Sequence, residues 1–312
     1  MIVTVAANTS IDHILFIPAY EPDATIRASR MVISVGGKAI DASWILGEMG
    51  LPSLSLGFAA GHNGEIVRDL LRAKGVTTDY VPVEGESRRN ILIIPENGSG
   101  QTSITASTLI VRPEHITALR ERYIRSLDKA TVVVLGGTLP KGMEPAFYED
   151  YIQLARARDI PVVFDGSEPY LSAGLKGRPN YVKPNRDEIS QYAGREITTV
   201  AEAYKVGREI YERYGTCPII TLGSDGGLAV LEDRAYRVPP LTVPVSNVAG
   251  AGDAVLAGLA ASIARNEPIE EGIRLGFAAS AAVVMMPGTA ECRREDIEDL
   301  LKRVELIPYE PA

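Results

Sequence analysis

Short apolar runs, each the length of a buried strand, alternate with segments of helical periodicity along most of the chain. The runs predicted to be strands are Ile2–Ala6, Leu54–Phe58, Thr131–Leu135, Pro161–Phe164, Tyr181–Lys183, Ile219–Leu222 and Gly227–Leu231. The segments predicted to be helices are Ala39–Met49, Gly64–Lys74, Pro145–Arg158, Ala201–Tyr214, Ala254–Ala264, Ile269–Met286 and Arg294–Val304. Strands that are apolar throughout are typical of a parallel sheet covered by helices. The 312 residues therefore predict an α/β fold, and because no linker separates independent units we expect a single domain over 1–312.

Two segments break this alternation. Residues 13–35 are strand-like without the expected helix, and residues 89–105 read as a hairpin around the turn Pro95-Glu-Asn-Gly-Ser-Gly. We expect the two segments to pair as a small β-sheet that projects from the main domain. Such a sheet would expose apolar surface unless a ligand or a second subunit covers it, which predicts a lid and a homodimer formed through it.

The sequence Asn247-Val-Ala-Gly250-Ala251-Gly252-Asp253 leads directly into an alanine-rich helical segment. Glycine allows a ligand to approach the backbone, and the free N–H groups of a first helical turn bind anions. Asp253 suits the positive end of a helix, and its carboxylate can accept a proton from an attacking hydroxyl. Anion donors beside a base are what phosphoryl transfer requires, although an ordinary helix start capped by Asp would look similar.

Three further motifs combine glycine or polar residues with strand ends or helix starts. Gly36-Gly37-Lys38 precedes a helix that carries Asp41 in its first turn. Lys183, Asn185 and Glu188 follow a strand, where ligand sites of α/β sheets gather. The last motif, which contains Thr221, Gly223 and Gly226, is a turn between two strands. Each has an ordinary structural explanation, a turn or a capped helix, when it is taken alone.

Several classes of function are disfavoured. The net charge of −8 opposes general binding to nucleic acids. The first residues lack the pattern of a signal peptide, and the low-charge stretch 277–286 is too short to span a bilayer, so we expect a cytoplasmic protein without membrane contact. The three histidines are scattered and the two cysteines are far apart, which disfavours zinc. No glycine fingerprint follows the first strand, which disfavours a dinucleotide-dependent oxidoreductase.

In their order along nearly the whole chain, these motifs resemble the PfkB/ribokinase family of small-molecule kinases. The resemblance also rests on Asn8-Thr-Ser-Ile-Asp12, Ser87-Arg88-Arg-Asn90 and Gly136-Gly-Thr-Leu-Pro-Lys-Gly142. It is strongest to the subgroup of 1-phosphofructokinase and tagatose-6-phosphate kinase. It implies a ribokinase-like three-layer fold, a mostly parallel central sheet flanked by helices, and a small β-sheet lid through which these kinases dimerise.

The resemblance implies a role for the residues of the helix start. Asp253 would be the general base, and Gly250, Ala251 and Gly252 would supply the N–H groups that receive the transferred phosphoryl group. The residues implied to contact ATP and Mg²⁺ are Lys183, Asn185, Glu188, Thr221, Gly223 and Gly226, with Asn185 and Glu188 reaching Mg²⁺ through water.

For the acceptor, the resemblance implies an ATP-dependent transfer to a hydroxyl of a ketohexose monophosphate. The residues implied to bind it are Asp12, Gly36, Gly37, Lys38, Asp41, Arg88 and Asn90. Asp12 and Asp41 would bind hydroxyl groups, with Gly36 and Gly37 packed against the sugar. Lys38 and Arg88 would face the phosphate that the substrate already carries.

The chain departs from the family pattern Gly-Gly-Lys-Gly-x-Asn, because Ala39 replaces the glycine and Asp41 the asparagine. A negative charge on Asp41 would favour hydroxyl groups and oppose a nearby phosphate. In the lid segment, Thr25 stands where relatives of the family have a lysine. Arg88 and Lys38 thus favour a phosphorylated acceptor, whereas Asp41, Ala39 and Thr25 favour an unphosphorylated sugar, polyol or nucleoside. A third interpretation is a non-catalytic sugar sensor on the same scaffold, which the retained Asp253 and its glycines disfavour.

Overall fold

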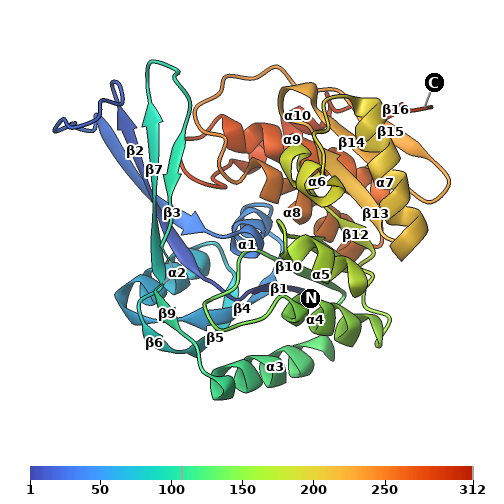
Figure 1. The fold of residues 1–312 in the computed structure, drawn as a ribbon, viewed down its shortest axis with the longest axis horizontal. Helices are drawn as coiled ribbons and strands as arrows, with labels where there is room; N and C mark the ends of the chain where they lie inside the picture. The colour runs from blue at the N-terminus through green and yellow to red at the C-terminus, as the bar shows by residue number, and fades with distance from the viewer. Residues whose placement is uncertain (107, 311–312) are drawn as a thin grey trace.

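A ten-stranded sheet is the middle layer of the computed structural model, which describes residues 1–106 and 108–310 (Figure 1). The strand order is β16-β15-β14-β13-β12-β11-β10-β1-β4-β5. Neighbouring strands from β5 to β13 are parallel, and those from β13 to β16 are antiparallel. The strands are β1 (Ile2–Ala6), β4 (Ser53–Ala59), β5 (Thr77–Pro82), β10 (Val132–Gly136), β11 (Val162–Asp165), β12 (Tyr181–Val182), β13 (Cys217–Thr221), β14 (Gly227–Val230), β15 (Ala235–Val238) and β16 (Ile307–Pro308). The predicted α/β fold with a mostly parallel sheet is confirmed.

Helices cover both faces of this sheet (Figure 1). The first face is covered by α1 (Lys38–Glu48), α2 (Gly61–Ala73), α8 (Ala251–Arg265), α9 (Ile269–Val284) and α10 (Arg294–Leu301). The second face is covered by α3 (Pro113–Leu127), α4 (Ala146–Arg156), α5 (Tyr170–Lys176), α6 (Arg186–Ala193) and α7 (Val200–Tyr214). Successive side chains of a strand point to opposite faces, so Val132 and Val134 enter the first core while Val133 and Leu135 enter the second. Within the described residues, no helix has both the length and the apolar character needed to cross a bilayer.

A separate four-stranded sheet, here called the small sheet, projects from the main sheet (Figure 1). Its strands, in spatial order, are β3 (Arg30–Gly36), β2 (Ser10–Ile17), β7 (Arg88–Pro95) and β8 (Thr102–Ile104). Strand β2 pairs parallel with β7 and antiparallel with β3. The predicted pairing of residues 13–35 with 89–105 is therefore present, and the sheet begins three residues earlier than predicted, at Ser10. The short strands β6 (Glu84–Gly85) and β9 (Leu109–Ile110) pair beside it.

Some elements were not predicted from the sequence. Helices α3 and α5 and strands β5, β15 and β16 are among them. The buried stripe of α3 is narrow: Leu119, Tyr123 and Leu127 recur every four residues between charged positions. Helix α2 begins three residues before its predicted start, and α10 ends at Leu301 rather than at Val304.

Helices α8 and α9 cross with their backbones in direct contact. A Cβ at Gly258 of α8 would overlap the backbone of Gly276 in α9 and would also crowd the carbonyl oxygen of Gly272. Backbone atoms cannot move aside as a flexible side chain can. The close crossing fixes the position of α8, whose first turn carries Asp253.

We predict that Gly258→Ala destabilises the protein, although alanine is the better helix former by about 1 kcal/mol. The added methyl group has no space at the crossing, and overpacking of this kind costs roughly 1–3 kcal/mol. Urea unfolding measures the change. Lys205→Ala, on the exposed face of α7, is the control and should lie within about 0.5 kcal/mol of the parent. A Gly258→Ala protein as stable as the control would contradict the close crossing.

Candidate active site

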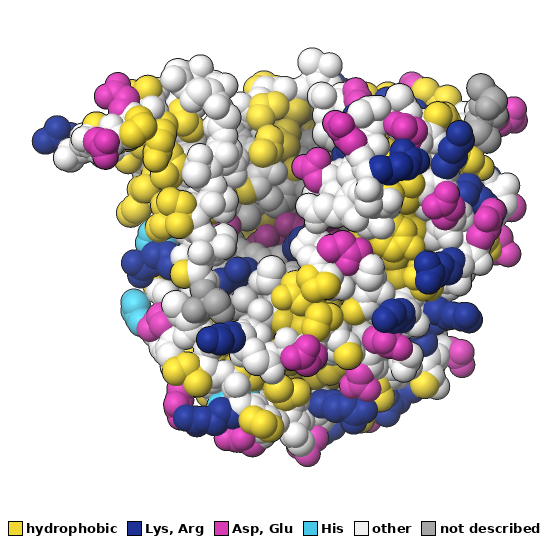
Figure 2. Space-filling view, in the orientation of Figure 1, with side chains coloured by type: hydrophobic (Ala, Val, Ile, Leu, Met, Phe, Trp, Pro, Cys, Tyr) yellow, Lys and Arg dark blue, Asp and Glu magenta, His cyan; other side chains and the backbone are white. Residues whose placement is uncertain are grey.

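A hollow between the small sheet and the rest of the molecule has acidic and basic side chains at its base (Figure 2). Strand β1 runs parallel to β10, and β10 to β11 and β12, so their carboxyl ends share one edge of the sheet. The small sheet rises from that same edge, because β1 leads into β2 after three residues. Ligands of open α/β sheets bind at this edge.

The start of α8 presents free backbone N–H groups. Gly250 precedes the helix in a left-handed conformation (φ 82°), and a Cβ there would overlap the backbone of Ala290. The Oδ1 atom of Asn247 accepts a hydrogen bond from the N–H of Ala249 at 3.0 Å, which fixes the approach to the helix. Within the described residues, the N–H groups of Gly250 and Gly252 have no acceptor. The N–H of Ala251, which was predicted to join them, instead donates to the carbonyl oxygen of Val248 at 3.3 Å. The turn therefore has the N–H groups of Gly250 and Gly252 available for an anion.

Asp165, the last residue of β11, joins two lysines from distant parts of the sequence. Its Oδ1 atom lies 2.5 Å from Nζ of Lys38, and its Oδ2 atom lies 2.9 Å from Nζ of Lys183. The Asp165 carboxyl is completely buried, which favours its neutral form, yet the two ammonium groups hold its pKa below the ordinary value. This residue was not predicted from the sequence. It directly follows the predicted strand Pro161–Phe164, but the neighbouring sequence does not indicate that two lysines meet there.

Lys183 brings its charge to the start of α8. Its Nζ atom lies 3.2 Å from the place that a Cβ of Gly252 would occupy. The ammonium group is buried, whereas the side chain of Lys38 keeps 27% of its surface exposed. Two cations therefore stand beside the free N–H groups of the helix, and both add to the attraction for an anion there.

Asp253 lies in the first turn of α8 with its carboxyl group buried. Burial raises the pKa of Asp253 to about 6, and the negative charge of Asp165 adds to the rise. The charges of Lys38 and Lys183 act in the opposite direction and limit it. The group is thus ionised at neutral pH, and its pKa is high enough to accept a proton.

Asp41 of α1 lies opposite Asp253. Its Oδ2 atom accepts a hydrogen bond from the N–H of Gly37 at 3.2 Å, and its carboxyl is a neighbour of the carboxyl of Asp253. Burial and the charges of Asp253 and Asp12 raise the pKa of Asp41 well above its usual range. The first turns of two helices thus face each other across this pair.

Asp12 and Asn90 lie on the inner face of the small sheet. Asp12 accepts hydrogen bonds from Nδ2 of Asn90 at 2.7 Å and from Oγ1 of Thr289 at 2.8 Å. These hydrogen bonds favour ionisation, but burial dominates and raises the pKa of Asp12. Gly36 lies against this carboxylate without room for a Cβ. Thr289, 277 residues further along the chain, was not predicted to belong to the site.

Arg88 lies on the same face as Asn90, two residues before it on β7. Burial lowers the pKa of its guanidinium group, and the charges of Asp12 and Asp41 act in the opposite direction. Within the described residues, it makes neither a salt bridge nor a hydrogen bond, and its Nε atom is buried without a partner. A half-buried cation without a counter-ion is a candidate site for an anionic group of a ligand.

The motif after β12 is held together by a capping box. Oδ1 of Asn185 accepts from the N–H of Glu188, and Oε2 of Glu188 accepts from the N–H of Asn185, both at 2.8 Å. The remaining oxygen of Glu188, Oε1, lies 2.7 Å from Nζ of Lys38. Asn185 also forms a parallel bridge with Thr221, which leads into the turn of Gly223 and Gly226.

The predicted site residues thus fall into two connected groups. The first contains Asp12, Asn90, Gly36, Gly37 and Arg88 with Asp41, at the small sheet. The second contains Lys38, Lys183, Asn185, Glu188 and Thr221, with Gly223 and Gly226 beyond it. The Asp41–Asp253 pair joins the groups. Lys38 pairs with Asp165 and Glu188 in the second group, whereas the sequence placed it with Arg88.

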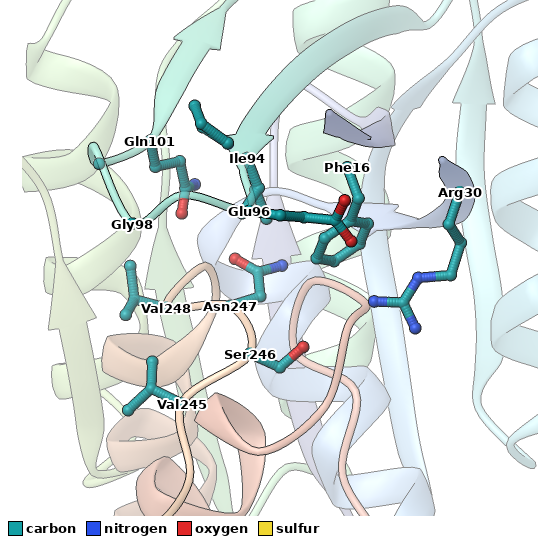
Figure 3. A pocket seen from close by; sticks show the side chains of 12 residues that line it. Phe16, Arg30, Ile94, Glu96, Gly98, Gln101, Val245, Ser246, Asn247 and Val248 are labelled. Atoms are coloured by element: carbon teal, nitrogen blue, oxygen red, sulfur yellow. The ribbon is translucent and has the colours of Figure 1, made fainter. Parts of the chain in front are cut away.

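A cavity of about 490 Å³ lies between the small sheet and the segment that leads into α8. Figure 3 shows Phe16 and Ile94 on one side of it and Val245 and Val248 on the other. The two valines are 66% and 57% exposed. The small sheet and the main body are therefore separated at this end of the hollow.

The chain is similar to known proteins over nearly its whole length. Residues 2–296 match the pfkB family carbohydrate kinases. The chain is 31% identical to 1-phosphofructokinase of Haloferax volcanii, over 96% of this chain and 95% of the relative, and 26% identical to tagatose-6-phosphate kinase of Staphylococcus epidermidis, over 98% and 99%. The crystal structure of phosphofructokinase-2 from Escherichia coli in complex with substrates and products superposes with a TM-score of 0.90 at 26% identity, covering 97% of this chain and 98% of that chain. The chain therefore belongs to the pfkB family of carbohydrate kinases.

Proposed function

We propose that this chain transfers the terminal phosphoryl group of ATP to a hydroxyl of a ketohexose monophosphate. The observation that carries the proposal is the start of α8, where the Asp253 carboxylate, free N–H groups and the ammonium group of Lys183 meet. Within one helical turn, the base can accept the proton of the acceptor hydroxyl and the anion site can stabilise the phosphoryl group that is transferred. A non-catalytic sensor would need neither.

In the proposed reaction Asp253 accepts the proton of the acceptor hydroxyl. The hydroxyl oxygen forms a bond to the γ-phosphorus of ATP while the bond from that phosphorus to the bridging oxygen of ADP breaks. Negative charge spreads over the oxygens of the transferred group. The N–H groups of Gly250 and Gly252 and the cations of Lys38 and Lys183 are placed to stabilise this charge.

The motif of Asn185 and Glu188 fits a magnesium ion held through water. Both oxygens of Glu188 already accept hydrogen bonds, so direct coordination would break the capping box or the contact with Lys38. Mg²⁺ usually keeps several waters and binds through substrate phosphates and few carboxylates. Bound in this way, it would neutralise charge on the phosphates of ATP, while Thr221, Gly223 and Gly226 contact the nucleotide.

The substrate assignment rests on Arg88. Its guanidinium group has no counter-ion within the described residues and lies on the inner face of the small sheet, beside Asp12. Carboxylate and amide groups such as those of Asp12 and Asn90 suit sugar hydroxyls, whereas a guanidinium group suits a phosphate. The names of the relatives, a 1-phosphofructokinase and a tagatose-6-phosphate kinase, support the same class of acceptor.

The small sheet is proposed as the lid of this site, as expected from residues 13–35 and 89–105. Closure would fill the cavity between Phe16 and Ile94 on the sheet and Val245 and Val248 on the main body, and would bury the two exposed valines. A closed lid would exclude the water that otherwise hydrolyses ATP.

The outer face of the small sheet supports a homodimer. Met31, Ile33 and Ile104 are 57%, 44% and 55% exposed. The strand register aligns Ile33 with His13 on β2, His13 with Ile91 on β7 and Ile91 with Ile104 on β8. The three isoleucines therefore lie in one row across the sheet, with His13 between Ile33 and Ile91. Figure 2 shows hydrophobic side chains gathered over this sheet. A row of this kind is typical of a protein interface.

We predict that Asp253→Asn lowers kcat by roughly 10²- to 10⁴-fold, the usual contribution of a general base. Asparagine keeps the shape of the side chain but cannot accept the proton. A coupled assay with ATP, Mg²⁺ and fructose 1-phosphate or tagatose 6-phosphate measures the loss. Calorimetric titration should show ATP affinity close to that of the parent, and exposed Asp233→Asn is the activity control. Full turnover by Asp253→Asn would refute the assigned base.

Removal of the unpaired guanidinium group tests the substrate. Arg88→Ala should raise the KM for the sugar phosphate about 10- to 100-fold, because a charged hydrogen bond contributes about 1.5–3 kcal/mol. Arg89→Ala, one residue further on β7 and exposed, is the matched control and should leave KM unchanged. If only unphosphorylated sugars, polyols or nucleosides are turned over, and Arg88→Ala does not affect them, the phosphorylated substrate is wrong.

The dimer predicts the effect of a charge on the outer face. Ile33→Asp should convert the dimer to a monomer in sedimentation velocity, since a buried carboxylate at the interface would lack a partner. Ile307→Asp is the control, because Ile307 is equally exposed (46%) but lies on β16, at the far edge of the main sheet. A monomeric parent protein, or a dimeric Ile33→Asp variant, would contradict the interface.

A further inference from the structure

One oxygen of Asp41 is buried without a hydrogen-bond donor among the residues that the structure describes. The side chain is buried, with the residue 3% exposed, and Oδ2 accepts from the N–H of Gly37 at 3.2 Å. Within residues 1–106 and 108–310, no group donates to the buried Oδ1 atom. An ionised carboxylate with one oxygen buried and unsatisfied is costly, whereas a protonated oxygen becomes a donor itself.

The group beside Asp41 is an acceptor as well. The carboxyl of Asp253, on the facing helix, is near enough for its charge to raise the pKa of Asp41. Two neighbouring buried carboxylates cannot both ionise at low cost, and a shared proton resolves the conflict.

The surrounding cations do not remove this conflict. The charged groups around the pair are Asp12 and Arg88 beside Asp41, and Asp165, Lys38 and Lys183 beside Asp253. Lys38 and Lys183 are already paired with Asp165 and Glu188. Of these cations only Arg88, which interacts with the charges of Asp12 and Asp41, is not paired in this way within the described residues. The three carboxyl groups of Asp12, Asp41 and Asp253 outnumber it, so the site holds an excess of acidic groups.

We propose that Asp41 carries a proton at neutral pH and donates it from Oδ1 to the carboxylate of Asp253, as a positioning residue for the base. This proposal rests on the proposed function for the role of Asp253. The hydrogen bond would hold the Asp253 carboxylate in one orientation and leave its other lone pairs for the acceptor hydroxyl. No bond is made or broken in this arrangement.

The direction of the pKa changes agrees with the assignment of the proton. Burial and the two neighbouring acids raise the pKa of Asp41, while the hydrogen bond from Asp41 lowers that of Asp253. A neutral Asp41 adds no negative charge beside Arg88. The repulsion of a substrate phosphate, expected from the sequence because aspartate replaces asparagine, is then absent, and a phosphorylated acceptor is compatible with Asp41.

Infrared difference spectroscopy of the protein without substrates tests the proton directly. A carboxylic-acid carbonyl band should persist at neutral pH in the parent protein and disappear in Asp41→Asn. Asp12→Asn is the matched control: Asp12 is also buried but accepts from Asn90 and Thr289, so its substitution should leave the band in place. A parent protein without the band, or an Asp41→Asn variant that keeps it, would overturn the proposal.

The pH dependence of kcat tests the positioning role. In Asp41→Ala the base Asp253 loses its hydrogen-bond donor. The acidic limb of the plot of kcat against pH should therefore move to higher pH by about one unit, and kcat should fall by up to about 100-fold. In Asp41→Asn the amide replaces the donor, so the limb should stay near that of the parent, with kcat at least about 10-fold above Asp41→Ala. If Asp41 is instead ionised, both substitutions remove a negative charge and move the limb to lower pH, which overturns the proposal.

The two experiments separate this proposal from the proposed function. The infrared band requires neither ATP nor an acceptor, and it can be read in Asp41→Asn even if Asp41→Ala does not fold. A band assigned to Asp41 in a protein that phosphorylates no sugar phosphate would support the shared proton and overturn the proposed function.

Discussion

The arrangement of the site depends on the buried carboxylate of Asp165. This group lies at the end of β11, without exposure, between the ammonium groups of Lys38 and Lys183. A buried charge of this kind is stable only with its partners in place, and loss of one partner costs roughly 3–5 kcal/mol. The pairing ties the start of α1 to the central sheet and sets Lys183 against Gly252. Asp165 therefore positions the cations without occupying the anion site itself.

Two helix starts supply the chemistry of the hollow. Helix α8 contributes free N–H groups and Asp253, and α1 contributes Lys38 and Asp41. The close crossing of α8 and α9 at Gly258 fixes the first helix, and Asp165 fixes the second. Because both anchors are buried and both lie outside the anion site, the starts of the two helices are held in place before a ligand arrives.

The parts of the site that the sequence predicted are those with a local signature. The glycines before Asp253 and before Lys38, and the capping pair of Asn185 and Glu188, are each contained in one short segment, so their backbone geometry could be inferred from neighbouring residues. The mostly parallel sheet followed in the same way from apolar strands of regular length. These features are determined by interactions close in sequence.

The parts that the sequence did not predict arise from topology. Asp165 has no local signature, and only the order of β10, β11 and β12 brings it between two lysines. Thr289 reaches Asp12 across nearly the whole chain. Lys38 could be grouped with Arg88 from its motif, but its partners come from β11 and α6. Helix α3 was not predicted because its apolar stripe is narrow. A narrow stripe is enough for this helix, since it covers only one edge of the sheet.

Gly37 links the small sheet to helix α1. It is the single residue between the end of β3 at Gly36 and the start of α1 at Lys38, and its backbone is in a positive-φ conformation (φ 112°). Its N–H holds Asp41, whose carboxyl meets that of Asp253. A tilt of the small sheet would therefore rotate the backbone at Gly37 and shift the carboxyl of Asp41 relative to that of Asp253. Enclosure of a sugar and alignment of the Asp253 carboxylate that deprotonates it would then occur in the same movement.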